Sequence, residues 1–552
     1  MIGVICGKHD EEIAKELFEL FKTPWELYQE GRDYDVILCT DMNQNITEVD
    51  AKLIVIYSSE KTQFDSANQI KIEPGVKRAM LEYKKISFPV YGNVSTFREK
   101  ENPLIMTRES NKVAGREINS GNKKIIRIGF DLFYEVSFLL SKGQPEENAH
   151  IPTVEIHISM LRNWILAAGI PIVEIPAVPA GYNFTICLTH DVDFIKISQH
   201  KFDHTLMGFI YRALISSLRG FLTGRFPLRK LLKNYKAVLS LPFIYLGFIK
   251  DFWFQFDRYL EIERGVKSTF FIIPFKNRVG KRVPFKDRKR RATRYDIDEI
   301  RDVVQKLIHH GFEIALHGID AWHSSDLAYE ELKRIVEVTG QSEIGIRIHW
   351  LCFDEGSPKI LDKVGFLYDS TVGYNEAIGY RAGTTQVFRP LGLKDLLELP
   401  LHIQDIALIS PNQRGSTEIQ AWEQCKNMFH DASEHGGVLT ILWHMRSIAP
   451  ERLWEDFYIR LLSELKNRNV WFGTASQVVK WFRMRRALIF ESASFLGNKL
   501  HLSLKSDTIE IGPEFIIRVH LPENLRMISW ENNKGYMDFP WNGSKEVEIF
   551  LN

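Results

Sequence analysis

The hydrophobic and polar positions of the first 180 residues alternate in a way that predicts short strands and amphipathic helices. Strands are expected at Ile2–Cys6, Val36–Cys39 and Ala51–Tyr57, and helices at Glu11–Phe21 and Ile151–Ala168. Between them, residues 125–140 begin as a strand and continue as an apolar helix. A connector rich in Pro and Gly follows at residues 169–181. We therefore predict an N-terminal α/β domain over residues 1–180.

From residue 181 to residue 485, strand and helix patterns alternate repeatedly. The strand candidates are 184–189, 268–274, 312–316, 344–349, 366–369, 396–401, 438–443 and 469–473. Helical patterns between them include 296–309, 328–338, 422–433 and 453–466. A succession of about seven or eight β/α units predicts a barrel of parallel strands. In such barrels the functional side chains collect at the carboxyl ends of the strands.

After about residue 486 the pattern changes to short alternating runs separated by Gly, Pro and polar residues. These runs are 500–504, 508–511, 515–520, 527–530 and 546–551. Alternation with a period of two is typical of half-buried strands. We therefore expect a small C-terminal β-sandwich-like domain over residues 486–552.

A basic insertion at residues 195–250 separates the first two barrel strands. From 201 to 250 it carries nine Lys or Arg against one Asp or Glu, with apolar residues at near-helical spacing. A basic amphipathic segment of this kind can lie on an anionic membrane, which would give residues 200–245 a peripheral membrane contact. The alternative is a helical excursion that packs on the barrel and presents a basic face to water. We favour this alternative because helical apolar stripes usually belong to a core.

The amino-acid composition bears on which partners the protein binds and in which cellular compartment it works. The formal net charge is +1, so overall charge indicates no nucleic-acid partner. The five cysteines are scattered and form no C-x-x-C pair, which favours reduced thiols in the cytoplasm and argues against a cysteine-ligated zinc. No run of about 18 apolar residues occurs and the N-terminus lacks a basic leader, so we expect neither a spanning helix nor a signal peptide. Nothing in the sequence indicates an obligate protein partner.

Polar side chains follow most of the predicted barrel strands. The strand ends carry the segments Thr189–Asp193, His317–His323, Arg347–Trp350, Asp369–Thr371 and Leu442–His444. Packing alone gives little reason for several independent strands to end in His, Asp or Arg. Asp and His ligands with an open coordination position suit a borderline divalent ion, most simply zinc. Such an ion polarises a carbonyl and lowers the pKa of bound water to about 7, so these residues predict metal-assisted hydrolysis of an amide or ester.

The order of these segments resembles the polysaccharide deacetylases, the superfamily of the nodulation-type chitooligosaccharide deacetylases. The resemblance covers about 184 to 485, and Ser268–Ile272 is similar to the structural second-strand motif of the family. It implies an α/β fold with a distorted (β/α) barrel of the deacetylase type, flanked by the N-terminal α/β domain and a small C-terminal all-β domain. It also implies that a divalent metal assists the removal of acetyl groups from sugars.

The resemblance further implies roles for five residues. Asp191 and Asp193 match the family's first motif, in which the first carboxylate is the general base and the second a metal ligand. His317 matches the start of the histidine metal motif. Arg347 stands where the family has the arginine that orients the base, and His444 matches the general acid of the last motif.

Two departures from the family pattern affect the expected site. The family places a second metal-binding histidine four residues after the first, where this chain has an alanine. Asp320 lies nearer that spacing and His323 is the better ligand by chemistry, so both stay candidates for the third ligand. His349 replaces a more common proline, so we assign His349, Trp350 and Arg381 to substrate binding.

Two hypotheses of different classes follow. The first is a cytoplasmic, metal-dependent deacetylase-like hydrolase acting on an N-acetylated sugar or glycan precursor. The second is a catalytically decayed barrel that serves as a carbohydrate-binding or scaffold module, which the displaced second histidine would favour.

Overall fold

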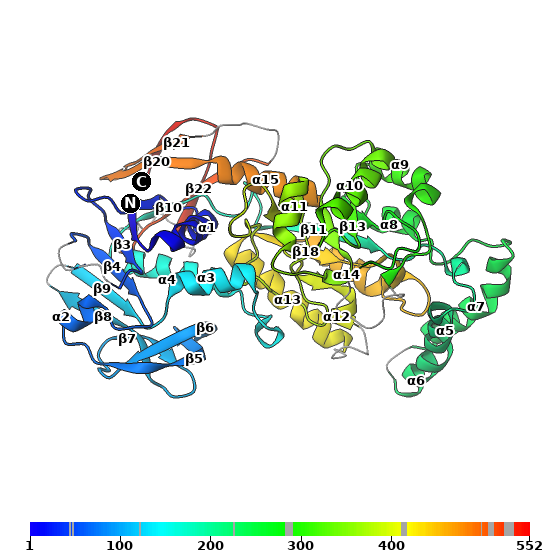
Figure 1. Cartoon of the computed structure of the whole chain (residues 1–552), viewed down its shortest axis with the longest axis horizontal. Helices are drawn as coiled ribbons and strands as arrows, with labels where there is room; N and C mark the ends of the chain where they lie inside the picture. Colours follow the sequence, from blue (N-terminus) through cyan, green and yellow to red (C-terminus); the bar gives the residue numbers. More distant parts are fainter. Residues whose placement is uncertain are drawn as a thin grey trace.

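The computed structural model describes residues 1–551 except 43–45, 47–48, 121–122, 225–226, 282–290, 410–416, 498, 506–512 and 524–534. The runs expected as strands at 508–511 and 527–530 therefore lie outside the described residues. Figure 1 shows an N-terminal sheet at one end, a second sheet with surrounding helices in the middle, and a helical arm at the other end. Both chain termini lie beside the N-terminal sheet (Figure 1).

In the described part of the chain, the N-terminal unit forms a nine-stranded sheet in the order β2-β1-β3-β4-β9-β8-β6-β5-β7. Its parallel strands are β1 (Ile2–Ile5), β2 (Trp25–Leu27), β3 (Val36–Cys39), β4 (Leu53–Tyr57) and β9 (Lys123–Ile128). Its antiparallel strands are β5 (Ile72–Tyr83), β6 (Ile86–Phe97), β7 (Pro103–Thr107) and β8 (Val113–Ser120). The helices are α1 (Glu11–Phe21), α2 (Gln63–Ala67), α3 (Leu132–Ser141) and α4 (Thr153–Ala167). The predicted elements of this region are present, and the antiparallel strands β5 to β8 are an addition that the sequence pattern did not predict.

The second sheet consists of parallel strands in the order β16-β15-β14-β13-β12-β11-β18-β17, and β19 also pairs with β11. The strands are β11 (Phe184–Val192), β12 (Ser268–Ile272), β13 (Glu313–Gly318), β14 (Ile346–Ile348), β15 (Tyr368–Asp369), β16 (Leu397–Glu398), β17 (Ile403–Gln404), β18 (Val438–Leu442) and β19 (Val470–Phe472). Among the described residues no pairing joins β16 to β17, so the sheet is an incomplete barrel. The prediction of a parallel, barrel-like α/β fold is confirmed at this level.

Helices surround this sheet. They are α8 (Phe256–Ile262), α9 (Arg301–His309), α10 (Ser325–Thr339), α11 (Ser357–Val364), α12 (Asp405–Ile409), α13 (Glu418–His435), α14 (Glu455–Lys466) and α15 (Ala475–Ala487). Strand side chains alternate between two apolar clusters. Phe184, Ile186 and Leu188 of β11 belong to the cluster that packs against α9, α13 and α14, whereas Cys187 belongs to the second cluster. Because side chains alternate along a strand, Asp191 and Asp193 share the face of Cys187.

The C-terminal strands do not form one self-contained sheet. Strands β20 (Ile489–Leu496), β21 (Lys499–Lys505) and β24 (Glu546–Phe550) form one sheet, and β22 (Ile516–His520) pairs with β23 (Tyr536–Pro540) and with β10 (Ile172–Glu174). Leu500 and Ile517 share an apolar cluster with Phe271 of the barrel-like sheet and with Trp481 of α15. The expected independent C-terminal β-sandwich is therefore not confirmed, because its strands pair with the connector and pack on α15.

The basic insertion forms a helical arm that projects from the barrel-like unit (Figure 1). It contains α5 (His204–Tyr211), a π-helical turn, α6 (Ser217–Leu222) and α7 (Leu228–Tyr245). The two sides of the arm bury a small core of their own that includes Leu206, Phe209 and Leu241. The expectation that the apolar positions pack on the barrel and leave a basic face in water is thus wrong in part, because many apolar side chains of the arm are exposed. No helix of the described residues is long and apolar enough to cross a membrane.

Candidate metal centre

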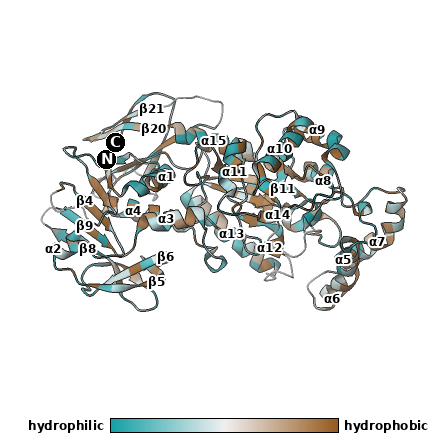
Figure 2. Ribbon diagram, in the orientation of Figure 1, coloured by the Kyte–Doolittle hydropathy of each residue, from teal (hydrophilic) through white to brown (hydrophobic). Residues whose placement is uncertain are grey.

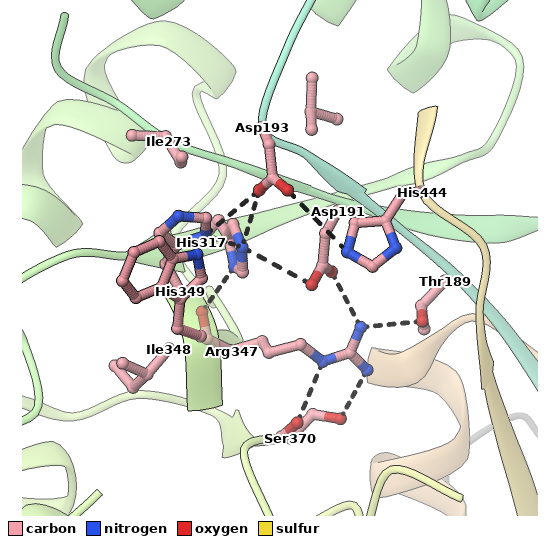
Figure 3. Close-up of polar contacts among 12 residues, drawn as sticks. Thr189, Asp191, Asp193, Ile273, His317, Arg347, Ile348, His349, Ser370 and His444 are labelled. Atoms are coloured by element: carbon pink, nitrogen blue, oxygen red, sulfur yellow. Dashed lines mark hydrogen bonds and ion pairs between the residues drawn. The ribbon is translucent and has the colours of Figure 1, made fainter. Parts of the chain in front are cut away.

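Three ligand-type side chains meet at the carboxyl ends of β11, β13 and β14. The Nδ1 atom of His349 lies 2.9 Å from Nε2 of His317 and 3.2 Å from Oδ1 of Asp193. Nε2 of His317 lies 3.4 Å from the same oxygen. Figure 3 shows the two imidazoles and the carboxylate pointing toward one another. These three atoms form a compact triangle, and each of the three residues can offer one of them to a metal ion.

The spacing and chemistry of this triangle fit a divalent ion. Ligand atoms about 2.0–2.1 Å from a tetrahedral zinc lie about 3.3 Å from one another, close to the spacing found here. Oδ1 of Asp193 is buried and, among the described residues, has no hydrogen-bond partner. A buried carboxylate oxygen without a donor is costly unless a cation satisfies it. Two imidazoles and one carboxylate form a donor set that suits zinc and also ferrous iron.

The structure gives the third position of the triangle to His349 and to neither of the two candidates that the sequence offered. Asp320 and His323 bond to each other, with Oδ1 of Asp320 3.2 Å from Nε2 of His323. The same Asp320 oxygen accepts a hydrogen bond from the backbone N–H of Lys281. Neither residue belongs to the set of ligand atoms that lie within 4.8 Å of one another. Asp320 and His323, the expected candidates for the third ligand, thus lie outside the cluster, whereas His349, which we assigned to substrate binding, lies inside it.

An unusual backbone conformation follows His349. Trp350 has a φ of 65° and Leu351 a φ of 50°, both in the left-handed region that non-glycine residues seldom adopt. Such strain persists only where the surrounding structure fixes it, and it concentrates at functional sites. The turn brings His349 into contact with His317 and leaves the half-buried indole of Trp350 at the surface of the neighbouring pocket.

Arg347 fixes the orientation of both His317 and Asp191. Nδ1 of His317 lies 2.9 Å from the backbone carbonyl of Arg347, which directs Nε2 toward the triangle. Arg347 is fully buried and donates from Nη1 to Oδ1 of Asp191 at 3.0 Å and to Oγ1 of Thr189 at 2.9 Å. Its remaining donors bond to the carbonyl and hydroxyl oxygens of Ser370. The second oxygen of Asp191 lies 3.5 Å from Nε2 of His317, so this carboxylate borders the triangle without belonging to it.

His444 faces the triangle from the opposite side, two residues after β18 (Figure 3). Its Nε2 lies 3.9 Å from Oδ2 of Asp193, and its Nδ1 lies 2.7 Å from Oδ1 of Asp405. The other Asp405 oxygen accepts the backbone N–H of His444 at 2.7 Å. Sequence reasoning missed Asp405, which stands directly after the two-residue strand β17. The only signal was an Asp at the end of a short apolar run.

Burial and neighbouring charges set the protonation of three of these groups. Burial alone would raise the pKa of Asp193, but the imidazoles of His349 and His317 hold it well below its ordinary value. Burial lowers the pKa of His349 to about 4. Burial would also lower the pKa of His444, but the Asp405 carboxylate outweighs this effect and raises it above its ordinary value. The site thus combines an ionised carboxylate and a neutral imidazole, as a metal requires, with a second imidazole that favours the protonated form.

The remaining conspicuous histidine of the first segment has a structural role. His190 points to the opposite face of β11, because it alternates with Asp191. Its ring nitrogens lie 2.8 Å from the carbonyl of Trp443 and 2.8 Å from the buried carboxylate of Glu263. These contacts use both ring nitrogens, so His190 has none left for the site.

The candidate metal centre opens into a pocket of about 1310 Å³ that the N-terminal unit helps to build. The barrel-like unit contributes Asp191, Asp193, His317, His349, Trp350, Tyr374, Arg381, Gln404 and His444 to its wall. The N-terminal unit contributes Arg78, Tyr91, Lys142 and Gln144. Of the residues assigned to substrate binding, Trp350 and Arg381 thus line the pocket, and Nη1 of Arg381 donates to the carbonyl of Gly373 at 2.7 Å. The N-terminal α/β unit, which we expected to flank the barrel-like unit, therefore forms one side of the candidate site.

Comparison with known proteins gives distant structural similarity only. No protein-family model matches the sequence, and no curated protein matches it either. A putative polysaccharide deacetylase from Mycobacterium smegmatis is similar at 19% identity and a TM-score of 0.33, over 56% of this chain and 95% of that chain. A probable polysaccharide deacetylase from Pseudomonas aeruginosa PAO1 has 16% identity and a TM-score of 0.34, over 56% and 94% of the two chains.

A family 4 acetyl xylan esterase from Clostridium thermocellum, solved with a cobalt ion, has 15% identity and a TM-score of 0.24, over 54% of this chain and 91% of that chain. TM-scores this low assign neither a family nor an activity. The geometry of the site itself has to carry any functional conclusion.

Proposed function

We propose that this protein is a metal-dependent hydrolase that removes an acetyl group from an N-acetylated sugar or glycan precursor. One observation carries the proposal: Asp193, His317 and His349 converge in a triangle of metal-ligand spacing, with the Asp191 carboxylate on one side and the His444 imidazole on the other. A metal ion held there supplies Lewis-acid polarisation of the acyl carbonyl and lowers the pKa of water, and zinc is the metal that we propose.

The flanking residues divide the proton transfers. Arg347 orients Asp191 through Oδ1, which leaves Oδ2 to accept the proton of the attacking water. Across the triangle, Asp405 fixes the ring of His444 and favours its protonated form, so Nε2 donates a proton to the leaving nitrogen. A base and an acid on opposite sides of the metal ligands are the arrangement that hydrolysis of an amide requires.

The pocket supports a substrate larger than one sugar. Its volume of about 1310 Å³ exceeds the ~300–1,000 Å³ of typical small-molecule sites. Tyr91, Trp350 and Tyr374 provide aromatic surface, and Arg78, Arg381 and Gln404 provide hydrogen-bond donors. Flat apolar surfaces beside polar donors suit sugar rings, which have an apolar face and hydroxyl groups at their rim.

The test combines metal analysis of the purified full chain with acetate release from a panel of N-acetylated mono- and oligosaccharides. We expect about one metal ion per chain, and Asp191→Asn should keep the metal but lower turnover by about 10²–10⁴-fold. His317→Ala should lose the metal and the activity together. His309→Ala, an exposed histidine on α9, is the matched control and should change neither.

Two results would contradict the proposal. If Asp191→Asn lost the metal while His317→Ala kept it, the assigned roles would be refuted. If the gently purified protein held no metal and released no acetate, although it bound oligosaccharides, the chain would be a carbohydrate-binding module on a decayed barrel.

A further inference from the structure

The helical arm over residues 196–250 has two apolar faces where a surface helix ordinarily has one. One face of α7 is buried in the core of the arm through Leu231, Ala237, Leu241 and Ile244. A second series of apolar residues lies on the outside of the same helix and its C-terminal end. A helix that is apolar on both sides while one side meets solvent indicates a surface that is covered in the working state.

The exposed series on α7 forms a continuous stripe. Its members are Leu228, Leu232, Leu239, Phe243 and Leu246, each between 52% and 75% exposed. At 3.6 residues per turn these positions fall within about 80° of one another around the helix axis. The arm therefore presents a narrow apolar ridge along the full length of α7.

The helices on the other side of the arm also carry a series of exposed apolar residues. Met207, Tyr211, Ile215, Leu218 and Leu222 are exposed and follow one another at intervals of three or four residues along α5, the π-helical turn and α6. Residues three and four apart lie on the same face of a helix. Figure 2 shows hydrophobic stretches along these arm helices, at the end of the molecule farthest from the N-terminal sheet.

Basic side chains border the stripes. Lys233 and Lys236 are exposed on α7, where Lys233 directly follows Leu232 and Lys236 stands three residues before Leu239. Arg219 is exposed on α6, directly after Leu218. No salt bridge involves these three cations within the described part of the chain. The arm carries nine Lys or Arg against one acidic residue between 201 and 250, whereas the entire chain has a net charge of only +1. The positive charge of the protein is thus concentrated on the arm.

We propose that the arm binds the surface of an anionic lipid bilayer, with its apolar stripes in the headgroup–acyl boundary and its lysines on the lipid phosphates. An amphipathic helix with aliphatic and aromatic residues on one face and Lys or Arg beside them has the composition of an interfacial helix. Each basic residue near an anionic leaflet adds to the attraction. Phe202 and Phe248, 90% and 73% exposed, add two exposed aromatic side chains near the first and last residues of the inserted segment.

The charge of the arm argues against a second copy of the chain, or another protein, as the partner that covers this surface. A symmetric contact with a second copy of the chain would place two strongly basic arms together, and like charges across an interface oppose association. The cores of protein–protein interfaces are also depleted in lysine. A bilayer that carries anionic headgroups satisfies both the apolar stripes and the lysines.

The arm is anchored directly beside the metal centre. It leaves the barrel-like unit just after Asp193, and the Arg446 guanidinium contacts the rings of Phe194 and Trp253 at the two ends of the insertion. Asp251 accepts the backbone N–H groups of Ile197 and Ser198, which closes the base of the arm. Bilayer binding would therefore place the open end of the barrel-like sheet close to the lipid surface.

The test is sedimentation of the full chain with unilamellar vesicles of phosphatidylcholine, with and without 30% phosphatidylglycerol. The expected result is binding to the anionic vesicles, which weakens as salt is raised. The stripe variant Leu232→Ser/Leu239→Ser/Phe243→Ser should lower the bound fraction at least about tenfold. The matched control Tyr329→Ser/Ile419→Ser/Ile489→Ser, which changes similarly exposed residues outside the arm, should bind like the unmodified protein.

A charge variant separates electrostatic from apolar binding. Lys233→Glu/Lys236→Glu should reduce binding to anionic vesicles at least about tenfold and flatten its salt dependence, whereas Lys359→Glu/Lys363→Glu on α11 should not. Metal content and circular dichroism of every variant, which should stay unchanged, show that the chain is folded. The proposal is overturned if the unmodified protein does not sediment with anionic vesicles, or if the stripe variant binds as well as the control. It is equally overturned if stripe substitution dissociates a dimer of a protein that ignores vesicles.

Discussion

The N-terminal unit and the barrel-like unit both bury charged side chains at or beside the ends of parallel strands, but in the two clusters compared, only that of the barrel-like unit leaves a charged group incompletely satisfied among the described residues. In the N-terminal sheet, Arg127 and Asp65 are fully buried and form an ion pair at 2.9 Å. Arg127 also donates to the backbone carbonyls of Ser58 and Glu60, and Asp65 accepts the N–H and hydroxyl of Thr62 in a capping box. Each partner is provided from within the chain, so this cluster needs no ligand.

The ends of β11, β13 and β14 show the contrary arrangement. There Oδ1 of Asp193 is buried without a hydrogen-bond donor in the part of the chain that the structure describes, and nitrogens of two imidazoles face each other at 2.9 Å. Burial of a charge is therefore not by itself a sign of function in this molecule. Convergence of several ligand atoms that the chain does not satisfy distinguishes a site from a structural ion pair.

The largest expected effect is a loss of stability, and it tests the buried pair of Arg127 and Asp65 in the N-terminal unit. Arg127→Met removes one partner of a fully buried pair and leaves Asp65 uncompensated, so the free energy of unfolding should fall by about 3–5 kcal/mol. Denaturant unfolding measures this change, and Lys480→Met, which breaks an exposed pair with Glu343, should cost less than about 1 kcal/mol. Metal content should stay the same in both variants. If Arg127→Met removed the metal while the fold survived, the two sheets would not differ as described.

The next largest expected effect is a loss of metal affinity, and it tests the triangle of Asp193, His317 and His349. His349→Ala removes one corner of the triangle and should weaken metal affinity by more than about 100-fold, the upper end of what the loss of an outer-shell partner costs. His323→Ala, which removes the histidine favoured by ligand chemistry, should leave the affinity nearly unchanged. Metal competition with a chromogenic chelator measures both. The reverse ranking would show that the segment after β13 moves to supply the third ligand.

The smallest expected effect concerns the pH dependence of stability. It tests His157, a buried polar group that lacks a partner among the described residues but belongs to no candidate site. His157 of α4 is buried with no hydrogen-bond partner among the described residues and lies against the rings of Phe88 and Phe130, but no other ligand-type group joins it. Burial lowers its pKa from 6.5 to about 3, so between these values the unfolded chain binds more protons than the folded chain. Stability should therefore fall as the pH drops below about 6.5, by at most ~1.4 kcal/mol per pH unit from this residue.

His157→Leu should remove this contribution and flatten the acid side of the stability profile. Thermal or denaturant unfolding of the variant and the unmodified protein at several pH values from about 4.5 to about 7.5 measures the difference, because about two pH units of this range lie below the ordinary pKa of 6.5. Equal slopes for the two proteins would show that His157 gains a proton without unfolding, and hence that a polar partner reaches it.

Much of the fold was predictable because its signals are local. Strands buried on both faces are continuous apolar runs, and α1 begins and ends at the predicted residues Glu11 and Phe21. The period of two along β11 correctly indicated that Asp191 and Asp193 point into one pocket. The antiparallel strands β5 to β8 and the partners of β10 and β22 depend on contacts between residues far apart in the sequence, which periodicity does not report.

The candidate site was predictable only as far as it follows strand ends. The positions of Asp191, Asp193, His317 and His444 follow from where β11, β13 and β18 end. The third corner of the triangle depends on the left-handed conformation of Trp350, which no local pattern specifies. Spacing alone therefore pointed to the segment after β13 and not to His349. Asp405 follows a strand of two residues, too short to produce a hydrophobic pattern.

The shared wall of the large pocket separates chemistry from choice of substrate. The atoms that would handle the metal and the protons all come from the barrel-like unit, whereas Arg78, Tyr91 and Lys142 across from them come from β5, β6 and a segment beside α3. Substitutions at these three positions are expected to change which molecules the pocket accepts without disturbing the proposed reaction. By the same reasoning, the barrel-like unit by itself would hold the proposed reactive groups but lack the part of the pocket wall that the N-terminal unit supplies.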